Sequence, residues 1–444
     1  MFNTFKRKQD EPATIFSKKW IDDWKAAINS SDEYKAHGAG WNAPLILKVT
    51  DSHKFLNNPD AIGFYLDLKA GVCDELRYAS AKDEPNADAI LSAVAETWIK
   101  MIESGKDPLM MLMKGKLKLE KGSMVLLSTQ TKAAKALLDA APAVEKIKES
   151  ANNAYTEKSN GSSGYTEHTS FVSTTRGIDF DSFPMKLFQK AKVFGIWNPA
   201  DISFEKDRED WKKLTAEEKK IIIHLSALFM AGEEAVTLDL LPLIRVIANE
   251  KRIEEEIFLT SFLWEEAKHT EFFSRFVYKV MEQKPDFESF HTHFYKILFY
   301  QKLPSALQAL ENDSSPASQL RASGTYNMIV EGTLAETGYE AYYRMLAENN
   351  ILPGMQEGII KLKQDESRHI AYGIYLINRL LSENPDLIEL FELELETLLT
   401  DATNIIHEIF EPYEVVPFGL KKEWFLDFAI KQFQNRLEKL NLRV

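Results

Sequence analysis

The chain has 444 residues, of which 45% are hydrophobic and 27% charged, as expected for a soluble globular protein with more than one domain. Its formal net charge of −13 argues against a nucleic-acid partner and an anionic membrane surface, because both require clustered Lys and Arg. Cys73 is the single cysteine, which excludes an internal disulfide and cysteine-rich metal sites and favours the reducing cytoplasm. The opening residues, MFNTFKRKQDEPATIF, lack the apolar segment of a signal peptide.

Strand and helix patterns alternate irregularly in the N-terminal part. Period-2 or β-branched patterns predict strands at 45–51, 63–71 and 114–122, and amphipathic patterns predict helices at 87–105 and 131–144. Because no βαβ unit repeats, we expect an α+β domain. The part contains no His, Asp or Glu cluster with metal-ligand spacing, so its sequence suggests a binding module.

The segment DPLMMLMKGKLKLEKGSMVLLSTQTKAAKALL, residues 107–138, resembles the end of the sterol carrier protein type 2 domain. That resemblance covers residues 15–148 and implies an apolar tunnel that holds a lipid. In the alternative interpretation Met110, Met111 and Met113 only fill a core, as methionine often does. Residues 149–172, rich in Ser, Asn, Gly and Thr, then predict a flexible linker.

From residue 173 to 444 nearly every segment has helical periodicity, which predicts a mainly α fold with a helical bundle. One helix is expected to begin at Thr215, which forms an S/T-x-x-E capping box with Glu218. The apolar run 221–244 is long enough to span a membrane. Glu233 and Glu234 lie at its centre, where carboxylates are costly in lipid, so we expect no integral membrane segment.

Six residues of this bundle form a repeated pattern. Two helices carry Glu-x-x-His, which places both side chains on one helix face, and each is preceded by an acid within an apolar helix, 33 or 35 residues earlier. The pattern predicts a dimetal carboxylate site with the ligands Glu233, Glu266, His269, Glu331, Glu366 and His369. Cations would stabilise four buried carboxylates, and oxygen and imidazole donors suit iron and manganese.

The neighbouring ionisable residues are expected to lie outside this site. Glu234 and Glu265 point about 100° away from the adjacent ligands if their helices are regular, and Glu336 is expected to face elsewhere. His224, His291, His293 and His407 lack a matching acid, so we expect surface or capping roles for them. Asp365 is a candidate acceptor for the outward N–H of His269, with a solvated acid as the alternative.

Residues 171–444 resemble the ribonucleotide reductase small subunit and, more closely, the small-subunit-like ligand-binding oxidases with a ferritin-like fold. The resemblance rests on WNPADISF, AGEEAVTLD, EEAKH, TYNMIVEGTLAE and DESRHIAYGIY. It implies that the six residues hold a heterodinuclear manganese–iron pair, although the same residue types also suit Fe/Fe. It further implies an ether cross-link between Val236 and Tyr326, formed with dioxygen, and a long-chain fatty acid near Tyr339. Two departures, at Glu265 and Glu340, do not involve the expected ligands.

The leading hypothesis is therefore a cytoplasmic, dioxygen-activating oxidase that acts on a fatty acid or related lipid, and we expect a homodimer. The tethered carrier-like domain suggests that both parts handle the same lipid. One alternative is the radical-generating subunit of ribonucleotide reductase, but the last tyrosine, Tyr413, is far from the terminus, and no tyrosine-bearing tail follows. The other is a lipid carrier that oxidises itself only once.

Overall fold

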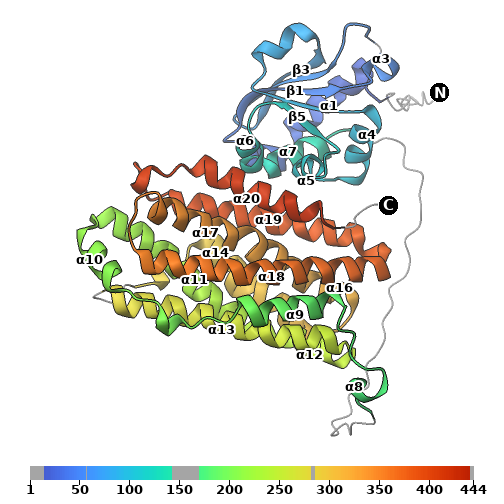
Figure 1. Ribbon diagram of the computed structural model, residues 1–444. Coiled ribbons are helices and arrows are strands. Elements are labelled where there is room, and N and C mark those ends of the chain that lie inside the picture. Colours follow the sequence, from blue (N-terminus) through green and yellow to red (C-terminus); the bar gives the residue numbers. More distant parts are fainter. Residues whose placement is uncertain (1–14, 57, 143–169, 282–285, 441–444) are drawn as a thin grey trace, which may run out of the picture. The chain divides into compact units, whose positions relative to one another are not determined.

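The computed structural model describes residues 15–56, 58–142, 170–281 and 286–440. The chain divides into two compact units, residues 1–160 and 161–444, and the division falls within the predicted linker. Most of that linker, 149–169, lies outside the described residues. Figure 1 labels the elements of both units.

The N-terminal unit contains a five-stranded sheet in the order β3-β2-β1-β4-β5. Only the pair β1–β4 is parallel. The strands are β1 Asn42–Val49, β2 Gly63–Lys69, β3 Val72–Ala79, β4 Ala89–Ala93 and β5 Lys118–Lys121. The helices are α1 Lys18–Ser30, α2 Asp32–His37, α3 Ser52–Phe55, α4 Ala95–Ser104, α5 Pro108–Met113, α6 Met124–Thr129 and α7 Thr131–Asp139.

The main core of this unit joins the sheet to α1 and α7. Trp20 and Trp24 of α1 pack on Phe64 of β2, with ring centroids 6.2 and 6.1 Å from it. Trp24 Nε1 also donates a hydrogen bond to the carbonyl of Leu137 in α7, at 2.9 Å. Large aromatic surface and a satisfied indole N–H thus fix both helices against one sheet face. The predicted α+β class is confirmed.

One prediction in this unit was wrong in detail, and one strand was missed. The helix expected over 87–105 is a strand, Ala89–Ala93, followed by the helix Ala95–Ser104. All five residues of β4 are buried, so the strand is continuously apolar, and a short apolar run does not distinguish a strand from a helix. Strand β3 was not predicted, because the register shift opposite Asp67 and Leu68 interrupts its alternation.

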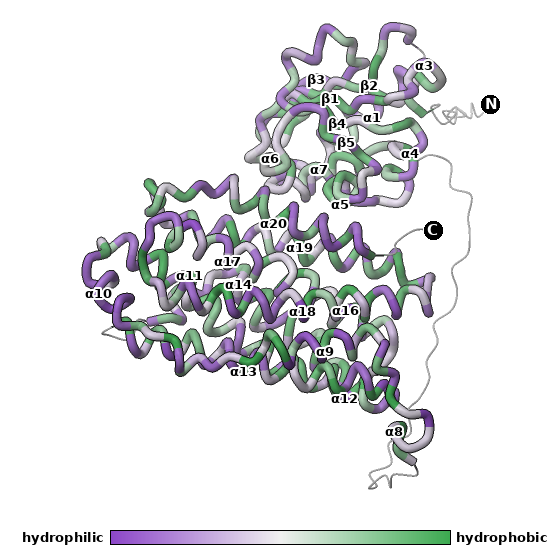
Figure 2. Tube along the Cα trace, in the orientation of Figure 1, coloured by the Kyte–Doolittle hydropathy of each residue, from purple (hydrophilic) through white to green (hydrophobic). Residues whose placement is uncertain are grey.

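The C-terminal unit is a bundle of long helices (Figure 1). Hydrophobic and hydrophilic residues alternate along them (Figure 2), as expected for helices that bury one side. The α-helices are α8 Val172–Thr175, α9 Phe183–Phe194, α10 Glu205–Lys213, α11 Ala216–Asp239, α12 Leu241–Asn249, α13 Ile253–Val280, α14 His293–Tyr295, α15 Leu303–Gln308, α16 Pro316–Ser323, α17 Glu336–Tyr342, α18 Pro353–Glu383, α19 Ile388–Phe410 and α20 Lys422–Leu437.

The helix that follows α16 changes its winding. Residues Gly324–Ala335 and Tyr343–Ala347 are π-helical, with hydrogen bonds from i to i+5, and α17 lies between them. A further π-helical segment, Lys296–Lys302, precedes α15. π-Helical segments are rare and often mark functional positions.

Capping interactions fix the start of two helices that reach the bundle centre. The predicted capping box of α11 is confirmed, since Thr215 Oγ1 accepts from the Glu218 N–H and Glu218 Oε2 accepts from the Thr215 N–H. At the start of α18, the buried carboxylate of Asp207 accepts from the N–H groups of Gly354 and Met355, both at 2.8 Å. In these contacts, side-chain oxygens accept hydrogen bonds from backbone N–H groups that a helix start leaves unpaired.

The stretch Ala216–Asn249, comprising α11 and α12, is long and apolar enough to cross a membrane by length and composition. In the structure 56% of its most apolar window is buried inside the bundle. A core helix is apolar because it packs against neighbouring helices, so burial in the bundle explains the apolar composition of this stretch.

Candidate metal centre

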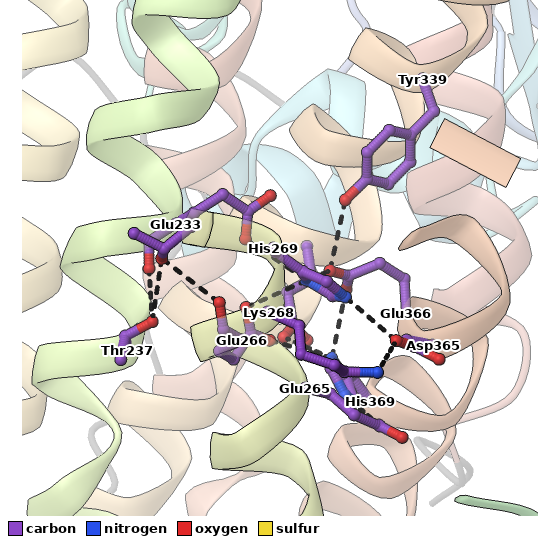
Figure 3. Close-up of polar contacts among 12 residues, drawn as sticks. Glu233, Thr237, Glu265, Glu266, Lys268, His269, Tyr339, Asp365, Glu366 and His369 are labelled. Atoms are coloured by element: carbon purple, nitrogen blue, oxygen red, sulfur yellow. Dashed lines mark hydrogen bonds and ion pairs between the residues drawn. The ribbon is translucent and has the colours of Figure 1, made fainter. Parts of the chain in front are cut away.

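The six side chains of the repeated pattern converge in the middle of the bundle. Figure 3 shows most of them with their contacts. Helix α11 supplies Glu233, α13 supplies Glu266 and His269, the π-helical segment supplies Glu331, and α18 supplies Glu366 and His369. All six are buried. We call these six side chains the metal centre.

Their ligand atoms form two overlapping groups. Glu233, Glu266, His269 and Glu366 offer atoms that all lie within 4.8 Å of one another, and so do Glu266, Glu331, Glu366 and His369. Glu266 and Glu366 belong to both groups, so each can place one oxygen toward either position. The arrangement could hold two neighbouring cations: each group has its own histidine and its own carboxylate, and both groups share Glu266 and Glu366.

Five of these ligand atoms are buried and have no hydrogen-bond partner among the described residues. They are Glu266 Oε2, His269 Nδ1, Glu331 Oε1, Glu366 Oε2 and His369 Nδ1. His369 Nδ1, for example, lies only 2.9 Å from Glu266 Oε1 but makes no hydrogen bond with it. Buried polar atoms are rarely left unpaired. Carboxylate oxygens and imidazole nitrogens that lie close together without hydrogen-bond partners fit a site for metal ions.

Burial and repulsion between carboxylates raise the pKa values of Glu233 and Glu331, whereas His369 and His269 outweigh the burial of Glu266 and lower its pKa. Burial raises the pKa of Glu233 to about 8, and the contact with His269 opposes that shift. Burial, together with the charge of Glu366, raises the pKa of Glu331 well above its ordinary value. The two histidines have pKa values raised well above the ordinary one, because the surrounding carboxylates outweigh the cost of burial. The metal-free site therefore retains protons, and binding of cations should release them.

In each histidine, the ring nitrogen that faces away from the metal centre contacts an acid of the other Glu-x-x-His helix. His269 Nε2 lies 3.3 Å from Asp365 Oδ2, and His369 Nε2 lies 2.9 Å from Glu265 Oε2. Acceptors at Nε2 fix the ring orientation and the tautomer, which leaves Nδ1 free to bind a cation. The contact expected between Asp365 and His269 is thus present.

Glu265 is not among the ligand groups, as expected, but the sequence analysis missed that it is fully buried and contacts His369. A regular helix does turn Glu265 about 100° from Glu266, but α13 has neighbours on several sides, since it packs on α9, α11 and α18. A signal was present in the sequence. EEAKH and DESRH both place an acid before the glutamate and a base before the histidine, and the structure pairs the acid of each motif with the histidine of the other.

The bases of these two motifs neutralise the acids. Arg368 Nη2 contacts Glu265 Oε1 at 2.6 Å and Asp365 Oδ1 at 2.5 Å, while Lys268 Nζ lies 3.1 Å from Asp365 Oδ2. All four side chains are buried. We call Glu265, Lys268, Asp365 and Arg368 the outer ion cluster. Trp197 Nε1 also donates to Asp365 Oδ2, at 2.8 Å, and the Lys268 ammonium lies over the Trp197 ring.

The π-helical segment brings Tyr326 and Glu331 to the same side. In an α-helix, residues five apart would point about 140° from each other, whereas in a π-helix they are successive hydrogen-bonded positions. Tyr326 is fully buried, and its hydroxyl donates to Glu266 Oε1 at 3.3 Å. Asn327 Nδ2 donates to Glu331 Oε2 at 2.9 Å and orients that carboxylate. Val236, one turn after Glu233 on α11, is also buried.

An apolar cavity of about 120 Å³ ends at the metal centre. Carboxylates of Glu233, Glu266, Glu331 and Glu366 line it, together with Val236. Its remaining wall is almost entirely apolar, with contributions from α11, the π-helical segment, α17, α19 and α20. Tyr339, on α17, is fully buried beside this wall, stacks on Phe229, and donates from Oη to Glu366 Oε1 at 3.2 Å (Figure 3).

The comparison with protein families assigns the C-terminal unit. The family described as ribonucleotide reductase, small chain, matches residues 185–443, which is more than half of the chain. The chain belongs to the ribonucleotide reductase small-chain family. The SCP-2 sterol transfer family also matches, over residues 21–133 of the N-terminal unit. Both resemblances identified from sequence motifs are confirmed.

Solved structures of this small-chain type are similar to the chain. A variant of an R2-like ligand-binding oxidase, anaerobically reconstituted with a Mn/Fe cofactor, is 39% identical, with a TM-score of 0.60, and the match covers 62% of this chain and 100% of that one. A variant of such an oxidase with an aerobically reconstituted Mn/Fe cofactor is 38% identical, with a TM-score of 0.60, covering 63% and 100%. The predicted ferritin-like bundle is confirmed.

Other ionisable residues of this small-chain unit do not join the metal centre. Glu234 is exposed, as expected, and Glu336 pairs with Arg436 at 3.7 Å. The expectation of surface positions was wrong for His224 and His291, which are buried. His291 is held by Tyr300 Oη and the carbonyl of Ala227, because the neighbouring segment before α14 covers that face of α11.

Proposed function

We propose that the chain is a metal-dependent oxidoreductase whose six-residue centre holds one manganese and one iron ion and activates dioxygen. The observation that carries this proposal is the set of five buried, unpartnered ligand atoms arranged around two cation positions. The Mn/Fe cofactor of the similar oxidases supports the choice of metals. When bound, the two ions would supply redox equivalents for the reduction of dioxygen.

Glu233, Glu266, His269, Glu331, Glu366 and His369 would bind the ions, with Glu266 and Glu366 as bridges. Asp365 and Glu265 orient the imidazoles of His269 and His369. Lys268 and Arg368, the bases of the outer ion cluster, balance the negative charge of these two acids. The apolar wall of the cavity excludes water from the centre. Metal analysis after reconstitution with both ions tests the pair, because an Fe/Fe enzyme would contain two irons and no manganese.

We propose a long-chain fatty acid or a related lipid as the ligand of the cavity. The apolar wall suits an acyl chain, and the end beside the metal centre suits its carboxylate, which the cations would attract. Tyr339 Oη, beside Glu366, is the candidate donor to that carboxylate. Mass spectrometry of lipids extracted from the purified chain tests this assignment, and the absence of any fatty acid or related lipid from the extract would contradict it.

The Val236–Tyr326 ether cross-link is proposed as the product of the reaction with dioxygen. The bond forms between a valine carbon and Tyr326 Oη, with loss of one hydrogen from each residue. This two-electron oxidation accounts for two of the four electrons that reduce dioxygen to water, and the reduced metals supply the other two. Support comes from the burial of both side chains and from the contact of Tyr326 with the bridging Glu266.

Tryptic mass spectrometry after aerobic reconstitution tests the cross-link. The Val236 and Tyr326 peptides should appear joined, with two hydrogens fewer than their sum. Tyr326→Phe should give only separate peptides, while Tyr342→Phe, a buried tyrosine that contacts Ser226 instead, should still give the joined pair. Separate peptides in the aerobically reconstituted native chain would contradict the proposal.

The N-terminal unit is proposed to bind the same class of lipid. A narrow apolar cavity in it is lined by Trp41 and Trp98 and by Leu109 and Leu112 of α5. Met110, Met111 and Met113 are buried but do not line this cavity, so they fill the core, and the leucines face the cavity instead. The test is lipid extraction from the two units expressed separately, and the absence of any shared lipid would refute a common ligand.

The family match itself favours one second candidate, the radical-generating subunit of ribonucleotide reductase. Nucleotide reduction on mixing with a large subunit would establish it. A lipid carrier that oxidises itself once is distinguished by oxygen consumption, because only an enzyme consumes dioxygen repeatedly with lipid and reductant present. We further propose that the chain is cytoplasmic and forms a homodimer. Sedimentation of the purified chain tests the homodimer.

A further inference from the structure

A column of aromatic rings leads from the metal centre toward the surface between α13 and α18. The ring of Phe262 stacks on that of His369, with centroids 3.6 Å apart and planes inclined by 9°. Phe258, one turn earlier on α13, lies 6.1 Å from Phe262 and 5.2 Å from Tyr372 of α18. Tyr372 is itself one turn beyond His369, so the column follows the contact between the two Glu-x-x-His helices.

Tyr372 is fully buried and pairs with a buried carboxylate. Its hydroxyl donates to Glu255 Oε2 at 3.0 Å. Arg379 Nε lies 3.4 Å and Arg252 Nη1 3.9 Å from Glu255 Oε1, so the acid has cationic neighbours on its other oxygen. Burial raises the pKa of Glu255, and Arg379 opposes that shift. Nothing in the metal centre requires this pair, but a phenol with an acceptor so close can lose its proton together with an electron.

Tyr375 continues the column to a polar surface cavity. Its ring centroid lies 6.2 Å from that of Tyr372, and its side chain is half-buried. The cavity has a volume of about 420 Å³, and Tyr375 lines it together with charged residues from the loop before α9 and the start of α13. The oxidisable ring of Tyr375 therefore lies where a small, water-soluble molecule can approach it.

We propose that Tyr372 and Tyr375 form a relay that carries single electrons inward from a small reductant in this cavity to the metal centre. The reductant class is a one-electron donor such as ascorbate. This inference rests on the proposed function, because the relay requires a centre that becomes oxidising. Phe258 and Phe262 fill the space between His369 and Tyr372, so the electron passes through packed protein. They are not themselves oxidised, because phenylalanine is too difficult to oxidise.

One electron passes inward in three steps. Tyr372 gives one electron to the oxidised centre, and its phenolic proton moves to Glu255 across the 3.0 Å contact. Tyr375 then gives one electron to the Tyr372 radical, while Glu255 returns the proton to Tyr372 and the proton of Tyr375 passes to water in the cavity. The reductant gives one electron to the Tyr375 radical, and water returns the proton. Both tyrosines and Glu255 end as they began.

The other aromatic contact of the centre is less suited to this role. Trp197 reaches His269 through Asp365, but the Lys268 ammonium lies 4.5 Å from the centroid of the Trp197 ring. A fixed positive charge at that distance opposes removal of an electron from the ring, and more strongly in a buried site. Both side chains donate to a carboxylate, Trp197 to Asp365 and Tyr372 to Glu255, but of these two rings only that of Trp197 has a cation over its face among the described residues.

The first test uses the metal-free full chain. Ser182, which lines the cavity, is replaced by Cys in a Cys73→Ala background and labelled with a ruthenium photo-oxidant. A flash with an electron acceptor in solution should produce a tyrosyl radical, followed by transient absorption and electron paramagnetic resonance. Tyr375→Phe should slow its formation several-fold, and Tyr372→Phe should remove the longer-lived part of the signal. Glu255→Gln should slow the transfer to Tyr372, and the buried, off-column control Tyr342→Phe should change nothing.

The second test follows reduction of the oxygen-treated Mn/Fe-loaded chain by ascorbate in a stopped-flow instrument. Tyr375→Phe and Tyr372→Phe should slow reduction several-fold at unchanged metal content and unchanged dioxygen consumption in the first turnover. If the native chain takes up no dioxygen, the proposed function fails, and the flash experiment alone decides whether the relay exists. If the native chain reacts with dioxygen but both tyrosine variants behave like it in both tests, the relay is refuted and the proposed function stands.

Discussion

Replacing Glu265 by Gln tests how the residues behind the histidines determine metal binding. The Glu265 carboxylate contacts His369 Nε2 at 2.9 Å and Arg368 Nη2 at 2.6 Å, and all three side chains are buried. Glutamine has the same shape, and one oxygen remains as an acceptor. It lacks the charge that strengthens the imidazole as a ligand and that balances Arg368.

The expected size of the effect follows from these contacts. Loss of a partner behind a metal-binding histidine typically lowers metal affinity by about 10–100-fold. The effect should fall on the position that uses His369, because His269 relies on Asp365. Removing one partner of a buried ion pair costs about 3–5 kcal/mol. Arg368 keeps Asp365 as its second partner, so the loss in the free energy of unfolding should lie at or below the lower end of that range.

The assay is titration of the metal-free chain with Mn(II) and Fe(II), followed by calorimetry, with urea unfolding measured in parallel. Glu271→Gln is the matched control, since Glu271 lies on the same helix, is exposed and pairs with the half-buried Arg275. One of the two binding events should weaken in Glu265→Gln and neither in the control. Equal weakening of both events, or of neither, would refute the assignment of Glu265 to His369.

Three further predictions concern other parts of the chain. Burial raises the pKa of Asp107 to about 6, above the value of about 3.9 in an unfolded chain, so the N-terminal unit should lose about 3 kcal/mol of stability as pH rises from about 4 to about 6. Asp107→Asn keeps an acceptor at the start of α5 and should remove that slope in urea unfolding. Gly358→Ala places a Cβ 1.9 Å from Phe272 Cζ, so it should separate α13 from α18 and lower stability by roughly 1–3 kcal/mol in thermal unfolding. Gly232→Leu fills the apolar cavity beside Glu233, so mass spectrometry should find less extracted lipid at unchanged metal content.

The bundle and the residues that converge in it were predictable because both follow from helical periodicity. Long helices repeat every 3.6 residues, and acids within apolar helices are costly unless cations meet them. The sequence therefore located Glu233 and Glu331 without any view of the fold. It also located Asp365, since an acid beside a ligand is the usual partner of a metal-binding histidine.

Burial on a second helix face could not be predicted in the same way. Glu265 points away from Glu266 around α13 but is still buried beside His369, and only the packing of α13 against several helices reveals this. The proximity of Tyr326 and Glu331 depends on π-helical winding, which propensities do not indicate. In the N-terminal unit, the burial of β4 in the sheet removes the alternation by which a strand is detected.

The central claim is that the buried carboxylates and histidines hold two metal ions that react with dioxygen. The most direct measurement is X-ray absorption of the chain loaded anaerobically with Mn(II) and Fe(II), recorded before and after exposure to dioxygen. We predict that both metal edges shift to higher energy with uptake of dioxygen, and that Glu366→Ala, which removes a bridging carboxylate, retains neither metal. Two bound metals that remain in their reduced state under dioxygen would contradict the account.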